Sequence, residues 1–120
     1  MTLPCSAPSS TYAVMGSIWI VCDGHAFLGR GRVSLLEEID DTGSISQAAR
    51  HMGMSYKKAW RLVQTMNELA GEPLVVRTSG GAGGGGTVLT PKGREMIATF
   101  RAIDAQYRAF LDEVMRRTEL

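Results

Sequence analysis

The segment from Ser44 to Leu62 constrains the fold most, because its sequence, SISQAARHMGMSYKKAWRL, predicts two short helices joined by a tight turn. Ala49, Gly53 and Ala59 stand four and six residues apart. A helix-turn-helix needs a small residue where its helices touch, a glycine with positive φ in the turn, and a small apolar residue on the second helix. This spacing therefore favours a DNA-binding motif, although a plain αα-hairpin has the same pattern.

Polar residues mark where both helices begin. Ser44 followed by Gln47 has the spacing of a capping box, and Ser55 is a typical N-cap for the second helix. Gly71 and Pro73 end that second helix. We therefore expect the two helices to start after Ser44 and Ser55.

The second helix has one apolar and one polar face. At about 100° per residue, an apolar stripe follows Ala59, and a polar group lies roughly opposite to it. The stripe consists of Ala59, Val63, Met66 and Ala70, and the polar group consists of Lys57, Arg61, Gln64 and Glu68. Basic N-terminal turns opposite a small buried face suit a helix in a DNA major groove. Tyr56 and Trp60 lie at the borders, where they either line the core or face outward.

Charge is unevenly distributed along the chain. The net charge is only +1, which taken alone argues against a nucleic-acid partner. Between Ser44 and Arg94, however, seven basic and two acidic residues give +5, and the remainder carries −4. A basic face on the central segment is expected when one side of a protein meets phosphates, whereas a solvated surface with a chance cluster is the alternative.

A glycine-rich loop separates two short segments, 74–78 and 87–90, that are predicted to be strands. Six of its eight residues are glycine. A phosphate-binding loop of the Walker type is excluded because no Gly-Lys-Ser/Thr follows. A flexible linker does not explain the flanking strands with Arg77 at the edge. We therefore predict the wing of a winged helix, in which Arg77 and bare backbone amides approach the sugar-phosphate backbone.

Thr90 and Pro91 begin a long helix, predicted over about 91–117, because threonine is a good N-cap and proline suits the first helical position. Apolar residues follow at heptad-like spacing: Met96, Phe100, Ile103, Tyr107, Phe110 and Val114. Such a helix reaches roughly 40 Å, more than a core of this size covers. We expect these residues to form a homodimer, or alternatively to be covered by the N-terminal segment of the same chain.

The remaining segments complete one domain. Residues 1–11 have no periodicity and are expected to be a disordered tail, with Met15 as an alternative natural start. Val14–Cys22 reads as a strand closed by Asp23-Gly24, and a helix follows from Arg30 to Gly43. Residues 12–120 then form a mainly α winged helix-turn-helix with a small β wing, an N-terminal strand and a long C-terminal dimerisation helix.

Several function classes are disfavoured. The apolar run from Tyr12 to Cys22 holds 11 residues, too few to span a bilayer, and no basic residue precedes Arg30, so a cytoplasmic protein without a signal peptide is expected. Cys5 and Cys22 are expected to be free thiols. His25 and His51 are isolated, so we predict neither an enzyme nor a metal site.

Four segments resemble the N-terminal DNA-binding domain of the ModE family of molybdate-responsive transcriptional regulators, with a more distant likeness to LysR-type winged helices. They are TGSISQAA (42–49), SYKKAW (55–60), MNEL (66–69) and TSGGAGGGGTVLTPKG (78–93). The resemblance covers about residues 15–115, and the glycine-rich wing followed by V-L-T is its most specific part.

The resemblance implies a homodimer that binds a palindromic site in double-stranded DNA and commonly represses molybdenum-related genes. Full-length members also carry paired β-barrel domains that bind molybdate. The 120 residues leave no room for them, so no cofactor and no molybdate binding are expected. The expected DNA-binding residues are Ser46, Gln47, Ser55, Tyr56, Lys57, Lys58, Arg61, Gln64, Arg77, Thr78, Ser79, Gly80 and Gly81. The alternative function is a dimerising module that modulates a full-length regulator.

Overall fold

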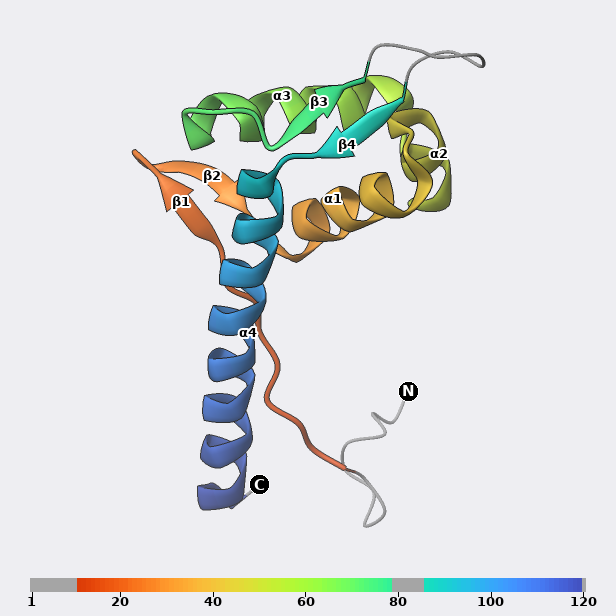
Figure 1. The fold of residues 1–120 in the computed structure, drawn as a ribbon. Helices are drawn as coiled ribbons and strands as arrows, with labels where there is room; N and C mark the ends of the chain where they lie inside the picture. Colours follow the sequence, from red (N-terminus) through yellow and green to blue (C-terminus); the bar gives the residue numbers. More distant parts are fainter. Residues whose placement is uncertain (1–10, 79–85, 120) are drawn as a thin grey trace.

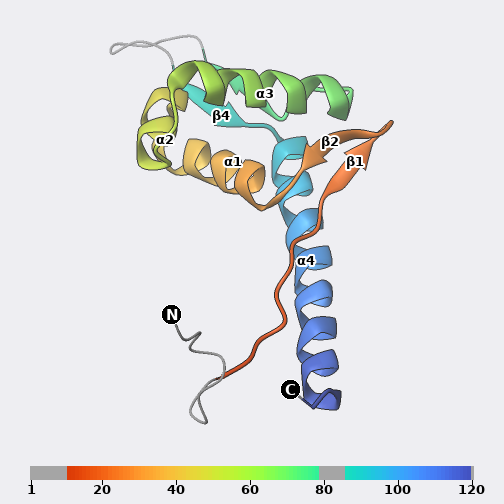
Figure 2. The same ribbon diagram turned by 180° about the vertical axis from the view of Figure 1, so that it is seen from behind.

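The structure, a computed structural model, describes residues 11–78 and 86–119. Its elements are β1 (Ile20–Cys22), β2 (His25–Leu28), α1 (Arg30–Thr42), α2 (Ile45–His51), α3 (Tyr56–Ala70), β3 (Val75–Arg77), β4 (Thr87–Leu89) and α4 (Pro91–Arg117). Helices α1, α2 and α3 and two β-hairpins form a head, from which α4 extends as a single long helix (Figures 1 and 2). The predicted fold class, a mainly α winged helix-turn-helix, is confirmed.

Side-chain caps start three helices where the sequence predicts them. The hydroxyl oxygens of Ser44, Ser55 and Thr90 accept hydrogen bonds from the backbone N–H three residues later, at 3.1, 3.1 and 3.0 Å. Each bond satisfies an N–H that has no partner within its helix. The Ser44 cap is not a reciprocal capping box, because the Ser44 N–H donates to the Thr42 hydroxyl instead.

The N-terminal strand is shorter than predicted and belongs to a hairpin. The sequence predicts one strand over Val14–Cys22, whereas the structure forms β1 from Ile20 to Cys22 and pairs it antiparallel with β2. Asp23 and Gly24 both have positive φ, 50° and 79°, which suits a two-residue hairpin turn. The second strand, β2, was not predicted, because His25 and Ala26 have little preference for strands.

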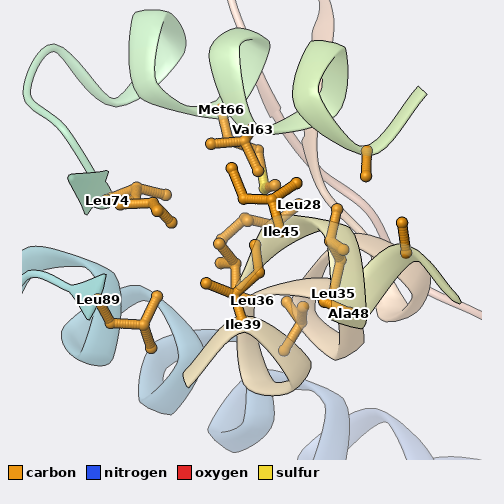
Figure 3. Packing of buried hydrophobic residues seen from close by; sticks show 14 of the residues in the cluster. Leu28, Leu35, Leu36, Ile39, Ile45, Ala48, Val63, Met66, Leu74 and Leu89 are labelled. Atoms are coloured by element: carbon orange, nitrogen blue, oxygen red, sulfur yellow. The ribbon is translucent and has the colours of Figure 1, made fainter. Parts of the chain in front are cut away.

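The core lies between α1, α3, β2 and the base of the wing. Leu28, Leu35, Leu36, Ile39 and Leu74 are fully buried there, and Figure 3 shows them with neighbours from α2, α3 and β4. The predicted stripe of α3 is also part of this core: Ala59, Val63 and Met66 are buried, and Ala70 is partly buried. The opposite side of α3 is therefore left at the surface.

The first turns of α4 belong to the same core. Gly93 is buried, and a Cβ there would lie 2.4 Å from the Leu74 carbonyl oxygen, so only glycine allows this close approach. Phe100 is also fully buried, which corrects its assignment to a surface for a second subunit. The dimerisation prediction thereby loses one of its six residues.

The N-terminal segment follows part of α4 beyond Phe100 (Figures 1 and 2). The Gly16 carbonyl accepts a hydrogen bond from Arg30, and Gly16 packs so closely against the Tyr107 hydroxyl that a Cβ there would displace the tyrosine side chain. The alternative of coverage within one chain thus holds for Tyr107. It does not hold for Ile103 and Phe110, which are 43% and 62% exposed. Within the described ranges, no helix is both long and apolar enough to cross a membrane.

Candidate functional site

The turn between α2 and α3 has the expected helix-turn-helix geometry. Gly53 has φ of 67°, and the Met54 N–H donates to the Ala49 carbonyl at 3.0 Å. Ala49 and Ala59 are 2% and 0% exposed, because they lie where the helices touch. The prediction for this segment is confirmed at each of the three small residues. Ser46 and Gln47 on α2 are left exposed beside the start of α3.

The outer side of α3 presents most of the predicted residues to solvent. Its predicted DNA-binding residues at 55–58, together with Arg61, are exposed, and Gln64 is half-buried. Lys57 and Arg61 are one helical turn apart, and neither makes an ion pair with the described part of the chain. Their charges are therefore available to a polyanion without first breaking an internal contact.

The wing forms by antiparallel pairing of β3 and β4. Val75, Val76 and Arg77 lie opposite Leu89, Val88 and Thr87. The pairing continues at Thr78, whose N–H donates to the Gly86 carbonyl at 2.9 Å and whose hydroxyl accepts from the Gly86 N–H at 3.0 Å. Arg77 and Thr78 are exposed at the end of this ribbon. Of the predicted wing residues, Ser79, Gly80 and Gly81 lie outside the described residues, as do residues 1–10 of the predicted tail.

The wing is hydrogen-bonded to the loop that precedes α2. The Thr87 N–H donates to the Gly43 carbonyl at 2.9 Å, and a Cβ on Gly86 would lie 2.9 Å from that same oxygen. Gly43 itself ends α1 in the left-handed conformation, with φ of 68°. This backbone bond holds the wing beside the helix-turn-helix, a connection that local sequence patterns do not reveal.

A cavity of about 450 Å³ lies between the wing and the helix-turn-helix. It is lined by residues from α2, α3 and both wing strands, including Ser46, Tyr56, Arg77 and Thr78. Four predicted site residues, separated by up to 32 positions in the chain, thus meet around one concave surface. Among the described residues that line it, Arg77 is the one basic residue, and the hydroxyl groups near Arg77 are hydrogen-bond donors suited to an anion.

Asn67 is important for this arrangement and was not identified from the sequence. Its side-chain oxygen accepts hydrogen bonds from the N–H groups of Leu74 and Val75 at 2.8 and 3.3 Å, and its amide donates to the Val75 carbonyl at 3.3 Å. The base of the wing is therefore fixed to α3. A single polar residue in a long amphipathic helix gives no sequence indication of such a role.

Metal-ligating side chains do not cluster among the residues that the structure describes. In the described part of the chain, no three His, Cys, Asp or Glu side chains lie close enough together to hold a metal ion. His51 Nδ1 lies 3.1 Å from Glu38 Oε2 at the surface, and Cys22 is a free thiol whose Sγ contacts the Leu69 carbonyl at 3.6 Å. The only predicted site residues that converge in the described chain are those of the helix-turn-helix and the wing.

Comparison with known proteins identifies one family and several similar proteins. The family described as bacterial regulatory helix-turn-helix protein, lysR family, matches residues 31–94. The Molybdenum transport protein ModE of Azotobacter vinelandii is 50% identical over 86 residues, which are 72% of this chain and 32% of that protein. The Molybdenum-pterin-binding protein MopB of Rhodobacter capsulatus is 54% identical over 80 residues, or 67% of this chain and 30% of that protein.

A third relative is the DNA-binding transcriptional dual regulator ModE of Escherichia coli (strain K12). It is 46% identical over 80 residues, which are 66% of this chain and 30% of that protein. The chain thus spans about a third of the length of the relatives it matches. These matches confirm the resemblance to ModE proteins that the helix-turn-helix and wing segments predicted.

Proposed function

Because the chain belongs to the lysR family of bacterial regulatory helix-turn-helix proteins, we propose that it binds double-stranded DNA and regulates the transcription of molybdenum-related genes. The names of its ModE relatives, which include a DNA-binding transcriptional regulator and a molybdenum transport protein, support this assignment. The observation that carries it is that α2, α3 and the wing meet around one concave surface with Arg77 in its lining, while α3 exposes Lys57, Lys58 and Arg61 to solvent.

Two groups of residues have different roles in this proposal. The first turns of α3 enter the major groove, where Lys57, Arg61 and Gln64 meet base edges. The wing lies over the neighbouring sugar-phosphate backbone, which Arg77 contacts without reading sequence. Ser46, Gln47, Ser55, Tyr56, Lys58 and Thr78 complete the protein side of the interface.

Binding measurements at several salt concentrations test the proposal. We expect affinity for the promoter region of the chain's own gene to fall steeply with salt and to exceed that for random DNA. Arg61→Ala should reduce the binding free energy by about 1–3 kcal/mol and relax the preference for particular bases. Arg77→Ala should weaken binding to all DNA sequences alike and reduce the dependence of affinity on salt. Salt-independent affinity would exclude the function, and identical behaviour of both variants would exclude the division of roles.

The DNA-binding unit in this proposal is a homodimer of the domain formed by residues 12–120. The exposed Ile103 and Phe110 lie on one face of α4, and a second copy of α4 would cover them. A two-fold axis between the copies would place two α3 helices on a palindromic site.

Analytical ultracentrifugation tests the dimer. Phe110→Glu should shift the chain to a monomer at micromolar concentration, because it places a charge in the apolar contact. Ala105→Glu is the matched control: it adds the same charge at an exposed position on the other side of α4, and it should leave the dimer intact. Dissociation by both variants, or by neither, would locate the contact elsewhere.

A second candidate function uses the same apolar face of α4. With Phe110 62% exposed, this face is also suited to pair with a full-length regulator, so that the chain acts as a modulating partner. The two functions differ in one observation: the purified chain alone shifts DNA in the first and does not in the second.

A further inference from the structure

Trp60 is a large aromatic residue that the fold leaves at the surface of α3. It is 43% exposed, although its neighbours Ala59 and Val63 lie in the core. Its indole N–H makes no hydrogen bond with the described part of the chain. Figures 1 and 2 show α3 on the side of the head that is turned away from the long α4 helix. The exposed part of the Trp60 side chain is thus free to contact another molecule.

Helical geometry places Trp60 among the residues proposed to read bases. At about 100° per residue, it lies about 40° from Gln64, 60° from Lys57 and 100° from Arg61 around the helix axis. Tyr56 lies one turn earlier and is exposed as well, at 46%. It extends the aromatic surface toward the cavity beside the wing. The polar residues of α3 are therefore bordered by a strip of two exposed aromatic rings.

We propose that Trp60 is a specificity-determining residue that recognises thymine in the major groove; this inference rests on the proposed DNA-binding function. The thymine methyl is the apolar group that base edges present in that groove, and an exposed apolar ring beside cations fits it. Exposed aromatic surface rimmed by polar residues is typical of binding sites. Lys57 and Arg61 supply hydrogen bonds and charge, and Trp60 supplies the apolar contact.

Thymine-to-uracil substitution tests this role directly, because deoxyuridine differs from thymidine only by the missing methyl. Duplexes enriched by the wild-type chain from a randomised pool are resynthesised with each thymine replaced singly. At one position in each half-site, we expect the wild type to lose about three- to fivefold in affinity. Trp60→Ala should bind thymine and uracil equally at that position. Lys57→Ala is the matched control, which should weaken binding but keep the thymine preference.

Fluorescence provides a second readout that does not depend on the alanine variant. The chain has two tryptophans, Trp19 and Trp60. With Trp19→Phe, saturating DNA should quench or shift the emission of Trp60. With Trp60→Phe, the emission of Trp19 should stay unchanged, because Trp19 packs against Gly29 and Arg32 on the hairpin side of the head.

Unchanged Trp60 emission at saturating DNA, or a thymine preference that survives Trp60→Ala, would overturn the inference. In either case, salt-dependent and sequence-specific binding by the wild type would leave the proposed function standing. If the wild-type chain enriches no DNA sequence at all, both the role of Trp60 and the proposed function are excluded.

Discussion

Helices α3 and α4 each carry a stripe of apolar residues at helical spacing. The stripe of α3 is buried in the core, whereas much of the stripe of α4 is exposed. In α3, Ala59, Val63 and Met66 are at most 2% exposed. In α4, Phe100 is fully buried, whereas Ile103 and Phe110 are 43% and 62% exposed. Periodicity shows which side chains share a face of a helix, and it does not show what covers that face.

The difference follows from how each helix meets the head. Figure 3 shows core residues of α1 and β2 beneath α3, so its apolar side is filled and its polar side faces outward. Only the beginning of α4 meets that core, and the rest extends away from the head (Figure 1). A buried stripe therefore orients the side of α3 that is proposed to read DNA, while the exposed part of the α4 stripe is available to a partner.

The largest expected effect separates the two parts of the α4 stripe. Phe100→Ala should lower the free energy of unfolding by about 3–5 kcal/mol, because it opens a cavity in the core. Phe110→Ala should cost less than about 1 kcal/mol when the chain is dilute enough to be monomeric. Urea denaturation followed by circular dichroism measures both. Equal losses of unfolding free energy would mean that Phe100 and Phe110 contribute equally to the stability of the monomer, which would contradict this comparison.

An intermediate effect is expected at Asp104, which anchors α4 beyond Phe100. This carboxylate is 5% exposed, lies 3.0 Å from Arg108 Nε and forms an ion pair with Arg30 on α1 at 3.7 Å. Asp104→Ala should lower the free energy of unfolding by about 1–3 kcal/mol. The loss is smaller than for removing one partner of a fully buried ion pair, because both arginines are partly exposed. Asp104→Asn should lose less, since its amide oxygen still accepts a hydrogen bond. The reverse order in urea denaturation would contradict this account.

The smallest expected effect on stability is the difference between the helix caps of α3 and α4. Ser55 caps α3 with one hydrogen bond, whereas the Thr90 hydroxyl caps α4 and also donates to the Pro73 carbonyl at 2.7 Å. Thr90→Ala should therefore cost about 1–2 kcal/mol and Ser55→Ala about 0.5–1 kcal/mol. Thermal unfolding of the two variants measures the difference, and a larger loss at Ser55 would be evidence against it.

Local features were predictable because they depend on residues close in the chain. The Ser55 and Thr90 caps, the glycine turn at Gly53 and the buried stripe of α3 agree with the structure. The hairpin strand β2 was missed because it is short and has a weak propensity. The burial of Phe100 was missed because its contacts come from distant segments, which a heptad-like spacing does not specify.

The sequence by itself determined the helix-turn-helix, the flanking strands of the wing and the resemblance to ModE proteins, because capping, turn geometry and helical periodicity act over a few residues. Tertiary structure alone decided how these parts meet. The bond from Thr87 to Gly43 holds the wing against the loop before α2, and the three bonds of Asn67 fix the base of the wing to α3. The first of these contacts joins residues far apart in the chain, and the others join two separate elements across a turn, so neither follows from capping or helical periodicity.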